Sequence, residues 1–330
     1  MNKIRWGILG AAKIAREHLI PAIQLSANGI VAAVASRDAA KGTALCQRFN
    51  IPHLFQSYDD LLAAPDIDAI YIPLPNALHV EWTHKAIAAG KHVLCDKPLA
   101  LRADDIDDLI AARDRSGLVV GEGFMVVHHP QWQHVKNLLA AGHLGTLRMV
   151  ESSFAFFNAD PNNIRNQPEL GGGALRDIGV YPVVTTRFAT GREPLSAHAS
   201  IEWDERFGVD RFATCLIDFG DFQLSFYCST QAAHRQHVTF HGDKSWLRLD
   251  APFNAGVYDI ARISSRMTGS STIEEIIFPQ ANHYQLMIEN FHAAMRGDEP
   301  LRFPLESSRA NQRVIDMIFA AAQPYPHVRG

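Results

Sequence analysis

The chain contains 330 residues, of which 47% are hydrophobic and 20% are charged, and it carries a formal net charge of −4. A chain of this length usually forms two domains, and this composition is that of a folded protein with a buried core. Charges of both signs are spread along the sequence, which argues against a nucleic-acid partner and against a basic membrane-binding surface. No apolar segment approaches the ~18–20 residues that a membrane-spanning helix needs.

Cysteine and histidine usage indicates a cytoplasmic protein without a metal. The first residues run directly into a strand-like segment, so we expect no signal peptide. His128, His129 and His134 cluster, but they lack the convergent partners of a zinc site, and we expect no bound metal. The cysteines are widely spaced, as is typical of reduced thiols, at Cys46, Cys95, Cys215 and Cys228.

Residues 1–125 alternate short apolar segments with helical patterns. The apolar segments predict buried strands at Ile4–Leu9, Ile30–Ser36, Ala69–Ile72, His92–Cys95 and Leu118–Gly121. The segments between them predict helices at Lys13–Leu25, Ala39–Phe49, Ala77–Ala89 and Ala103–Ser116, with a short helical turn at Asp60–Ala64. Apolar strands separated by helices are typical of a parallel sheet covered on both faces. We therefore predict a doubly wound α/β Rossmann domain over residues 1–125.

Residues 126–330 show longer segments in which apolar and polar residues alternate. This alternation predicts strands at Leu147–Phe157, Ala197–Trp203, Phe212–Phe219, Phe222–Cys228, His237–Phe240 and Trp246–Leu249. Helices are predicted at Trp132–Ala141, Gly179–Ala189, His283–Met295 and Glu306–Ala321. We predict an α+β domain with an open, mostly antiparallel sheet and helices on one face. We expect the free face of this sheet to form the interface of a homodimer or of a dimer of dimers.

A degenerate dinucleotide-binding motif lies between the first strand and the first helix. Gly10, Ala12 and Ala15 take the three places of the GxGxxG/A fingerprint. Alone, this motif fits a tightly packed turn equally well. Its place in a βαβ unit favours a site where the helix N-terminus, with Lys13 and Ile14, faces a diphosphate.

The end of the second strand points to the cofactor. NAD enzymes usually place a carboxylate there, but this chain has Ser36 and Arg37, a hydroxyl and a guanidinium suited to a 2′-phosphate. A solvated surface arginine is the alternative interpretation of Arg37. We expect NADP as the cofactor, with NAD as the alternative, and we interpret Asp38 as a helix N-cap.

Three further segments carry a family resemblance: residues 69–79 (AIYIPLPNALH), 89–98 (AGKHVLCDKP) and 168–182 (PELGGGALRDIGVYP). They resemble, in order, motifs of the glucose–fructose oxidoreductase / inositol dehydrogenase (Gfo/Idh/MocA) family. Tyr181 resembles the branch that contains dimeric dihydrodiol dehydrogenase and NADP-dependent pentose dehydrogenases. The resemblance implies that Lys97, Asp177 and Tyr181 are catalytic. It also implies a set of cofactor-side positions: Gly10, Ala12, Lys13, Ile14, Ser36, Arg37, Pro73, Asn76, His79, Asp96 and Lys97.

The chain departs from the family pattern in two places that bear on its chemistry. Asp96 precedes the lysine where glutamate is usual, so its contact would be looser. Val126 and Val127 replace a Tyr-Arg pair, so the substrate pocket would differ from that of relatives in which this arginine holds substrate. We expect Phe124, Arg165 and Asp177 to bind substrate.

Oxidising an alcohol with a nicotinamide requires a base for the hydroxyl proton. Tyr181 is the expected base; a free phenol titrates near pH ~10, and the Lys97 ammonium would favour the phenolate. Lys97 ends a buried strand, where a lysine without function is costly. Without the resemblance, Tyr181 would be interpreted as a packing residue. For Asp177 a helix N-terminal carboxylate, and for Arg165 a surface arginine, remain equally good interpretations.

Three functions are therefore open. The first is an NADP-dependent dehydrogenase that moves hydride between the nicotinamide and a secondary alcohol or hemiacetal of a sugar or trans-dihydrodiol. The second is a sugar oxidoreductase that recycles a tightly bound cofactor. The third is a dinucleotide sensor without activity, against which the presence of both Lys97 and Tyr181 counts. Each of these functions predicts a small-molecule ligand, which for the two enzymes is a polyol, sugar or diol. None of them predicts binding to a nucleic acid or to a membrane.

Overall fold

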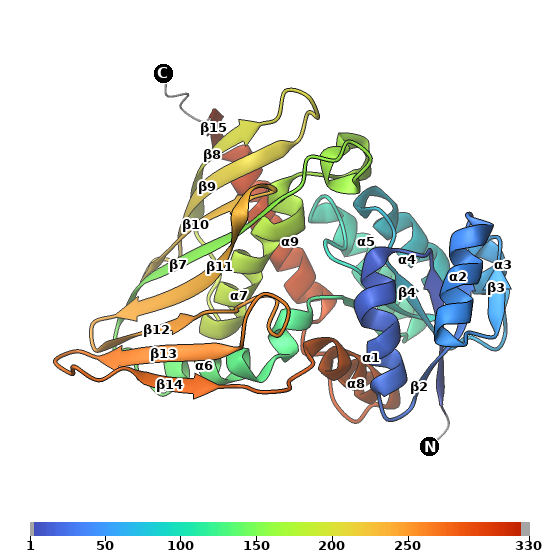
Figure 1. The fold of residues 1–330 in the computed structure, drawn as a ribbon, viewed down its shortest axis with the longest axis horizontal. Helices are drawn as coiled ribbons and strands as arrows, with labels where there is room; N and C mark the ends of the chain where they lie inside the picture. Colours follow the sequence, from blue (N-terminus) through green and yellow to red (C-terminus); the bar gives the residue numbers. More distant parts are fainter. Residues whose placement is uncertain (1–2, 325–330) are drawn as a thin grey trace. The chain divides into compact units, whose positions relative to one another are not determined.

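The computed structural model describes residues 3–324 and divides them into two compact units (Figure 1). The first unit comprises residues 3–128 and 282–309, and the second comprises residues 129–281 and 310–324. Within the described residues, no helix is both long enough and apolar enough to cross a membrane. Nor do three or more His, Cys, Asp or Glu side chains of that part of the chain converge as metal ligands would.

The first unit is built on a six-stranded parallel sheet of order β3-β2-β1-β4-β5-β6. Its strands are β1 (Ile4–Leu9), β2 (Gly29–Ala35), β3 (His53–Phe55), β4 (Ala69–Ile72), β5 (His92–Cys95) and β6 (Val120–Glu122). All residues of β4 are buried, as expected of a strand covered on both faces. The predicted doubly wound parallel sheet is confirmed. Strand β3 was not predicted, because three half-exposed edge residues carry no periodic signal.

The helices of this sheet follow the predicted order: α1 (Ile20–Leu25), α2 (Ala39–Phe49), α3 (Tyr58–Ala63), α4 (His79–Ala88) and α5 (Asp104–Ser116). The Asp38 side chain accepts a hydrogen bond from the Lys41 amide at 3.0 Å, which confirms it as the N-cap of α2. Helix α5 ends at Gly117, whose positive φ of 67° favours glycine.

The first unit also contains α8 (His283–Arg296), which lies late in the sequence and was predicted within residues 126–330. The grouping in space therefore differs from the predicted division at residue 125. The indole N–H of Trp6 in β1 donates to Nε2 of His292 at 2.9 Å, and the Trp6 and Phe291 ring centroids are 5.2 Å apart. Sequence periodicity gives no sign of such a contact, because it joins the two ends of the chain.

The second unit contains a nine-stranded sheet of order β14-β13-β12-β11-β7-β10-β9-β8-β15. The strands are β7 (Leu147–Phe157), β8 (Ser196–Trp203), β9 (Asp210–Asp218), β10 (Gln223–Ser229), β11 (Gln231–Gly242), β12 (Ser245–Leu249), β13 (Arg262–Met267), β14 (Glu274–Ile277) and β15 (Ala322–Pro324). Within this sheet, only the β10–β7 and β15–β8 pairs of described strands are parallel, so the predicted mostly antiparallel sheet is confirmed. Strands β13 to β15 were not predicted; all four residues of β14 are exposed.

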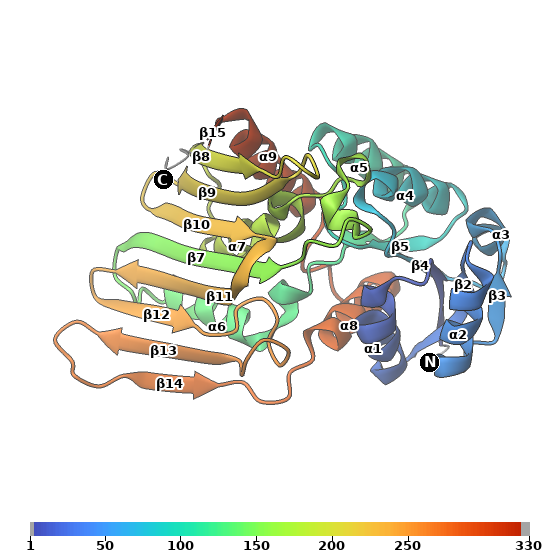
Figure 2. The same ribbon diagram turned by 45° about the horizontal axis from the view of Figure 1, so that its top comes forward.

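Helices α6 (Pro130–Ala140) and α7 (Val180–Thr190) pack together on one face of this sheet (Figure 2). Helix α9 (Leu305–Ala320) contributes its first residues to the first unit and the remainder to the second. Assembly of two chains through the other face of the sheet stays a prediction.

The buried Trp6–His292 pair generates a prediction about acid stability. Burial lowers the pKa of His292 to about 4, and a proton on Nε2 would break its bond with Trp6. The unfolded chain titrates near ~6.5, so the unfolded state binds the proton first, and stability falls as the pH drops from ~6.5 to about 4. We expect His292→Gln to remove about 1–2 kcal/mol of this loss.

The measurement is the free energy of unfolding of both proteins at several pH values in this interval. His53→Gln, at an exposed position of the same unit, serves as the control. Equal pH slopes for the wild type and His292→Gln would contradict the assignment.

Candidate active site

The first unit places the predicted diphosphate turn at the carboxyl end of β1. Gly10 has φ of 97°, and its amide donates to the Ala35 carbonyl at 2.7 Å. A Cβ at Gly10 would lie 3.3 Å from Leu74, so both conformation and space favour glycine. Ala15, the third fingerprint residue, is fully buried where the helix approaches the sheet. This turn fits a pyrophosphate, which helix N-termini in Rossmann folds bind.

At the end of β2, Arg37 is exposed and its guanidinium lies 5.8 Å from the centre of the Tyr58 ring. This contact orients a cation where the ribose of a dinucleotide is bound in the fold. Ser36 is less available. Its hydroxyl donates to the Asp38 carbonyl at 2.7 Å and accepts from the Asp38 amide, so it would have to rotate to donate to a phosphate.

The side chain of His79 contacts two backbone carbonyls, which its sequence motif did not predict. The ring is fully buried; Nε2 lies 2.7 Å from the Leu74 carbonyl and Nδ1 lies 2.7 Å from the Pro98 carbonyl. His79 thus joins the turns that follow β4 and β5. Pro73 and Asn76 belong to the first of these turns. Burial lowers the pKa of His79. Its predicted role toward the cofactor would therefore be exerted through the backbone.

Lys97 lies in the turn directly after β5, and its peptide bond to Pro98 is cis. The preceding Asp96 amide donates to the Ile72 carbonyl at 3.0 Å. On the other side, the Gly123 amide donates to the Cys95 carbonyl at 2.7 Å, and a Cβ there would lie 3.3 Å from that oxygen. The Lys97 turn is therefore held closely by both neighbouring strands.

Phe124 was predicted to line the substrate pocket, but its position does not support this. The side chain is only 1% exposed and packs edge-on against Phe303, with ring centroids 5.1 Å apart. Its apolar ring belongs to the core of the first unit. The residue follows a buried strand directly, and the sequence pattern does not distinguish core from pocket there.

In the second unit, a glycine turn precedes the segment with Asp177 and Tyr181. Gly173 has φ of 113°, and its amide donates to the Arg165 carbonyl at 2.9 Å. A Cβ at Gly173 would overlap the carboxylate of Asp210, which accepts from the Leu175 amide at 2.7 Å. Asp210 is buried, and this burial raises its pKa to about 7. Sequence analysis missed Asp210, which looks like an ordinary residue at a strand start.

Arg165 and Asp177 form an ion pair, with Nε of the arginine 2.5 Å from Oδ2 of the aspartate. The Arg165 side chain is 36% exposed, whereas that of Asp177 is 11% exposed. The guanidinium also lies 5.6 Å from the centre of the Phe156 ring. Of the two interpretations left open for each residue, the pair favours a joint polar site over a surface arginine.

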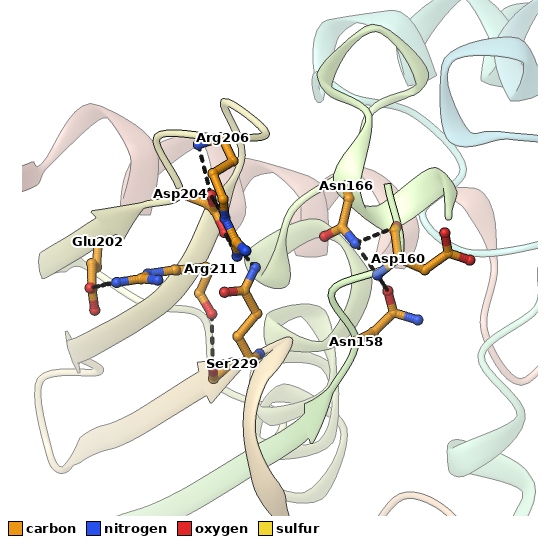
Figure 3. Close-up of polar contacts among 9 residues, drawn as sticks. Asn158, Asp160, Asn166, Glu202, Asp204, Arg206, Arg211 and Ser229 are labelled. Carbon is orange, nitrogen blue, oxygen red and sulfur yellow. Dashed lines mark hydrogen bonds and ion pairs between the residues drawn. The ribbon is translucent and has the colours of Figure 1, made fainter. Parts of the chain in front are cut away.

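The loop that carries Arg165 is held by a side-chain amide. Asn166 is buried and donates to Asn158 Oδ1 at 3.0 Å and to the Asp160 carbonyl at 2.8 Å (Figure 3). In the β8–β9 turn, buried Asp204 accepts from Arg206, which lowers the pKa of this carboxyl (Figure 3). These bonds fix two loops of the second unit at the end of the sheet where β7 ends.

Tyr181 is the second residue of α7 and is buried among aromatic rings. Its ring centroid lies 5.4 Å from that of Phe154 and 5.5 Å from that of Phe253. The preceding turn, Leu175–Gly179, is π-helical, as is Ala15–Leu19 behind the diphosphate turn. Such wide turns are frequent at functional sites. The sequence predicted neither, since each lies inside an ordinary helical pattern.

A cavity of about 1070 Å³ lies elsewhere in the first unit. Arg5, Gly29 and Asp66 on its wall lie at or before the amino ends of β1, β2 and β4. Parallel α/β sheets bind ligands at the carboxyl ends of their strands. We therefore assign the candidate site to the turns of Gly10, Arg37 and Lys97 rather than to this cavity.

The glycine turn yields a stability prediction with a matched control. Gly173→Ala introduces both an unfavourable φ and an overlap with Asp210, and we expect it to destabilise the protein by about 3 kcal/mol. Gly191→Ala changes a residue with φ of 67° and nothing within 4 Å of the added Cβ, so it should cost about 1 kcal/mol. Denaturant unfolding measures both values; equal losses would show that the Asp210 contact imposes no constraint.

Comparison with known proteins gives matches to two family models and to full-length relatives. Residues 4–124 match "Oxidoreductase family, NAD-binding Rossmann fold" and residues 132–248 match "GFO/IDH/MocA C-terminal domain". The chain is 40% identical over 327 residues to a dTDP-3,4-didehydro-2,6-dideoxy-alpha-D-glucose 3-reductase of Actinomadura kijaniata, covering 98% of this chain and 96% of the relative. It is 32% identical over 320 residues to D-xylose 1-dehydrogenase (NADP(+)) 2 of Haloferax volcanii, covering 96% and 97%.

A solved structure of KijD10, a 3-ketoreductase from Actinomadura kijaniata in complex with NADP and TDP-benzene, has a TM-score of 0.91 and 29% identity. The similarity covers 98% of this chain and 99% of the other. The order of motifs, both domain matches and the full-length similarity agree. The chain belongs to the Gfo/Idh/MocA family of oxidoreductases and carries the family's NAD-binding Rossmann domain.

Proposed function

We propose that the protein is an NADP(H)-dependent oxidoreductase that interconverts a secondary alcohol or hemiacetal and a carbonyl group on a sugar or a related diol. The observation that carries this proposal is the spacing of Lys97 and Tyr181. Structures of the Actinomadura kijaniata ketoreductase include one with a tyrosine-to-phenylalanine and one with a lysine-to-alanine replacement. The same number of residues separates those two positions as separates Lys97 from Tyr181.

Each residue has a chemical task in this proposal. The turns of Gly10 and Arg37 would hold the cofactor, which would supply a hydride acceptor as NADP⁺ and a hydride donor as NADPH. Tyr181 removes the hydroxyl proton during oxidation and supplies it during reduction. The Lys97 ammonium favours the phenolate that accepts this proton. Asp177, fixed by Arg165, binds a substrate hydroxyl.

The substrate class follows from the polar pair and from the relatives. Arg165 and Asp177 offer charge-assisted hydrogen bonds suited to vicinal hydroxyl groups. Relatives are named for a dTDP-deoxysugar, for D-xylose and for trans-1,2-dihydrobenzene-1,2-diol. All of these compounds carry oxygen atoms on neighbouring carbons, in a ring or in a chain that can cyclise. A panel of nucleotide sugars, aldoses and trans-dihydrodiols with NADP and NAD tests the proposal, and binding of NADP without any turnover would favour a sensor.

The proposed preference for NADP rests on Arg37. Its exposed guanidinium, oriented by Tyr58, would pair with the 2′-phosphate that NAD lacks. We expect Arg37→Ala to weaken NADP binding by about 10–100-fold, with little change for NAD. Fluorescence titration measures both dissociation constants. Arg115→Ala, an exposed residue of α5, controls for the change in net charge. Equal losses for both cofactors would contradict the assignment.

The proposed roles of Lys97 and Tyr181 predict a pattern of turnover numbers. We expect Tyr181→Phe to lower kcat on the order of 10²–10⁴-fold, the usual contribution of a general base, with little change in cofactor affinity. Lys97→Met should cost a similar factor. The double variant should be little worse than either single variant, because groups acting as a unit are not additive.

These values come from steady-state kinetics together with the NADP dissociation constant of each variant. Near-normal turnover by Tyr181→Phe, combined with an inactive Lys97→Met, would identify the lysine as the proton carrier. Tyr181 would then be a packing residue among Phe154 and Phe253.

A further inference from the structure

The turn that carries Lys97 is held on both sides by buried titratable side chains. His79 contacts the carbonyl of Pro98 at 2.7 Å, one residue after the lysine. Glu122, the last residue of β6, accepts a hydrogen bond at Oε1 from the Leu99 amide at 2.7 Å. His79 is fully buried and Glu122 is 6% exposed. The backbone beside Lys97 is therefore fixed by one contact on a carbonyl and another on an amide.

Of the two side chains, Glu122 is the one whose charge changes near neutral pH. Its pKa is about 7: burial raises it most, and the hydrogen bond from Leu99 and the Ser308 hydroxyl lower it. The nearby Asp96 carboxylate raises this pKa and the Lys97 ammonium lowers it. Glu122 therefore changes charge in the range where the enzyme would work.

Other polar side chains also lie around Glu122. A cavity of about 10 Å³, room for about one water molecule, is lined by Glu122, His128 and Asn290. Burial, with Arg302 and His283 nearby, lowers the pKa of His128 to about 3, so its ring is neutral above that pH. Ser308 faces the carboxyl from α9 and is uncharged. The charge of Glu122 thus acts mainly on the Leu99 amide and on Lys97.

We propose that Glu122 is a positioning residue for Lys97, and that its protonation state sets how firmly the turn from Lys97 to Leu99 is held. The proposal rests on the proposed catalytic role of Lys97. An ionised Glu122 binds the Leu99 amide through a charge-assisted hydrogen bond and attracts the ammonium group. A protonated Glu122 binds the amide more weakly and exerts no such attraction. Turnover then increases as Glu122 loses its proton.

The test uses Glu122→Gln, which keeps the shape and the acceptor oxygen but cannot ionise. The quantity is the ratio of wild-type to variant kcat across the pH range. The titration of Asp210 occurs in both proteins and cancels in this ratio. We expect a ratio near one at pH ~5.5 that rises through pH about 7 to about fivefold at pH ~8.5, the difference between a charged and a neutral acceptor. A ratio independent of pH would overturn the proposal.

A control variant and a second measurement separate this proposal from the function itself. Glu81→Gln removes an exposed carboxylate of α4, and its ratio should stay near one at every pH. The ¹⁵N–¹H resonance of Leu99, identified by its loss in Leu99→Met, should titrate near pH ~7 in the wild type and stay constant in Glu122→Gln.

The amide measurement needs no substrate, so it decides the matter even if Glu122→Gln fails to fold. A wild-type Leu99 resonance that does not respond to pH would overturn the proposal, whatever the activity. If the protein is inactive on all tested sugars and diols but its Leu99 amide titrates, the proposed function is overturned. The proposal that Glu122 holds the turn from Lys97 to Leu99 is then retained.

Discussion

A buried carboxylate that accepts a hydrogen bond from a turn amide is the interaction on which a turn with predicted site residues depends in each unit. Glu122 holds Leu99, two residues after Lys97, and Asp210 holds Leu175, two residues before Asp177. Neither Lys97 nor Asp177 lies on a regular strand or α-helix, so the backbone around them has few ladder bonds of its own. A charged acceptor supplies the strongest replacement for such bonds.

Burying these two carboxyl groups makes the stability of the fold depend on pH. Burial raises the pKa of Glu122 and of Asp210 to about 7, whereas a free carboxyl titrates near ~4. The folded state holds these protons more tightly, so stability falls as the pH rises from ~4 to about 7. Buried His128 and His292, with pKa values of about 3 and about 4, act in the opposite direction as the pH falls below ~6.5. The two effects partly cancel over this interval.

The sequence was sufficient to predict features that depend on neighbouring residues alone. The apolar strands of the Rossmann sheet, the Asp38 N-cap and the place of Gly10 follow from periodicity and from residue conformational preferences. Contacts between distant segments could not be predicted. The Trp6–His292 bond assigns α8 to the first unit. Phe124 looked like a pocket residue until its packing on Phe303 was visible. No sequence motif identified Glu122 or Asp210 as residues that hold a turn.

The residues that hold the Lys97 turn and the residues of the Arg165 loop have different physical surroundings. His79 and Glu122 are buried against backbone atoms, so a substitution that removes the ring or the acceptor oxygen would leave a polar backbone group without its partner. Arg165 is more than one-third exposed and stands on a loop held by the side-chain amides of Asn166 and Gln167. Under the proposed function, changes in that loop would alter the contacts with a substrate, whereas Lys97 stands on a turn held by its own buried bonds. The proposal thereby allows different substrates on one chemistry, and the relatives are named for varied sugars and a diol.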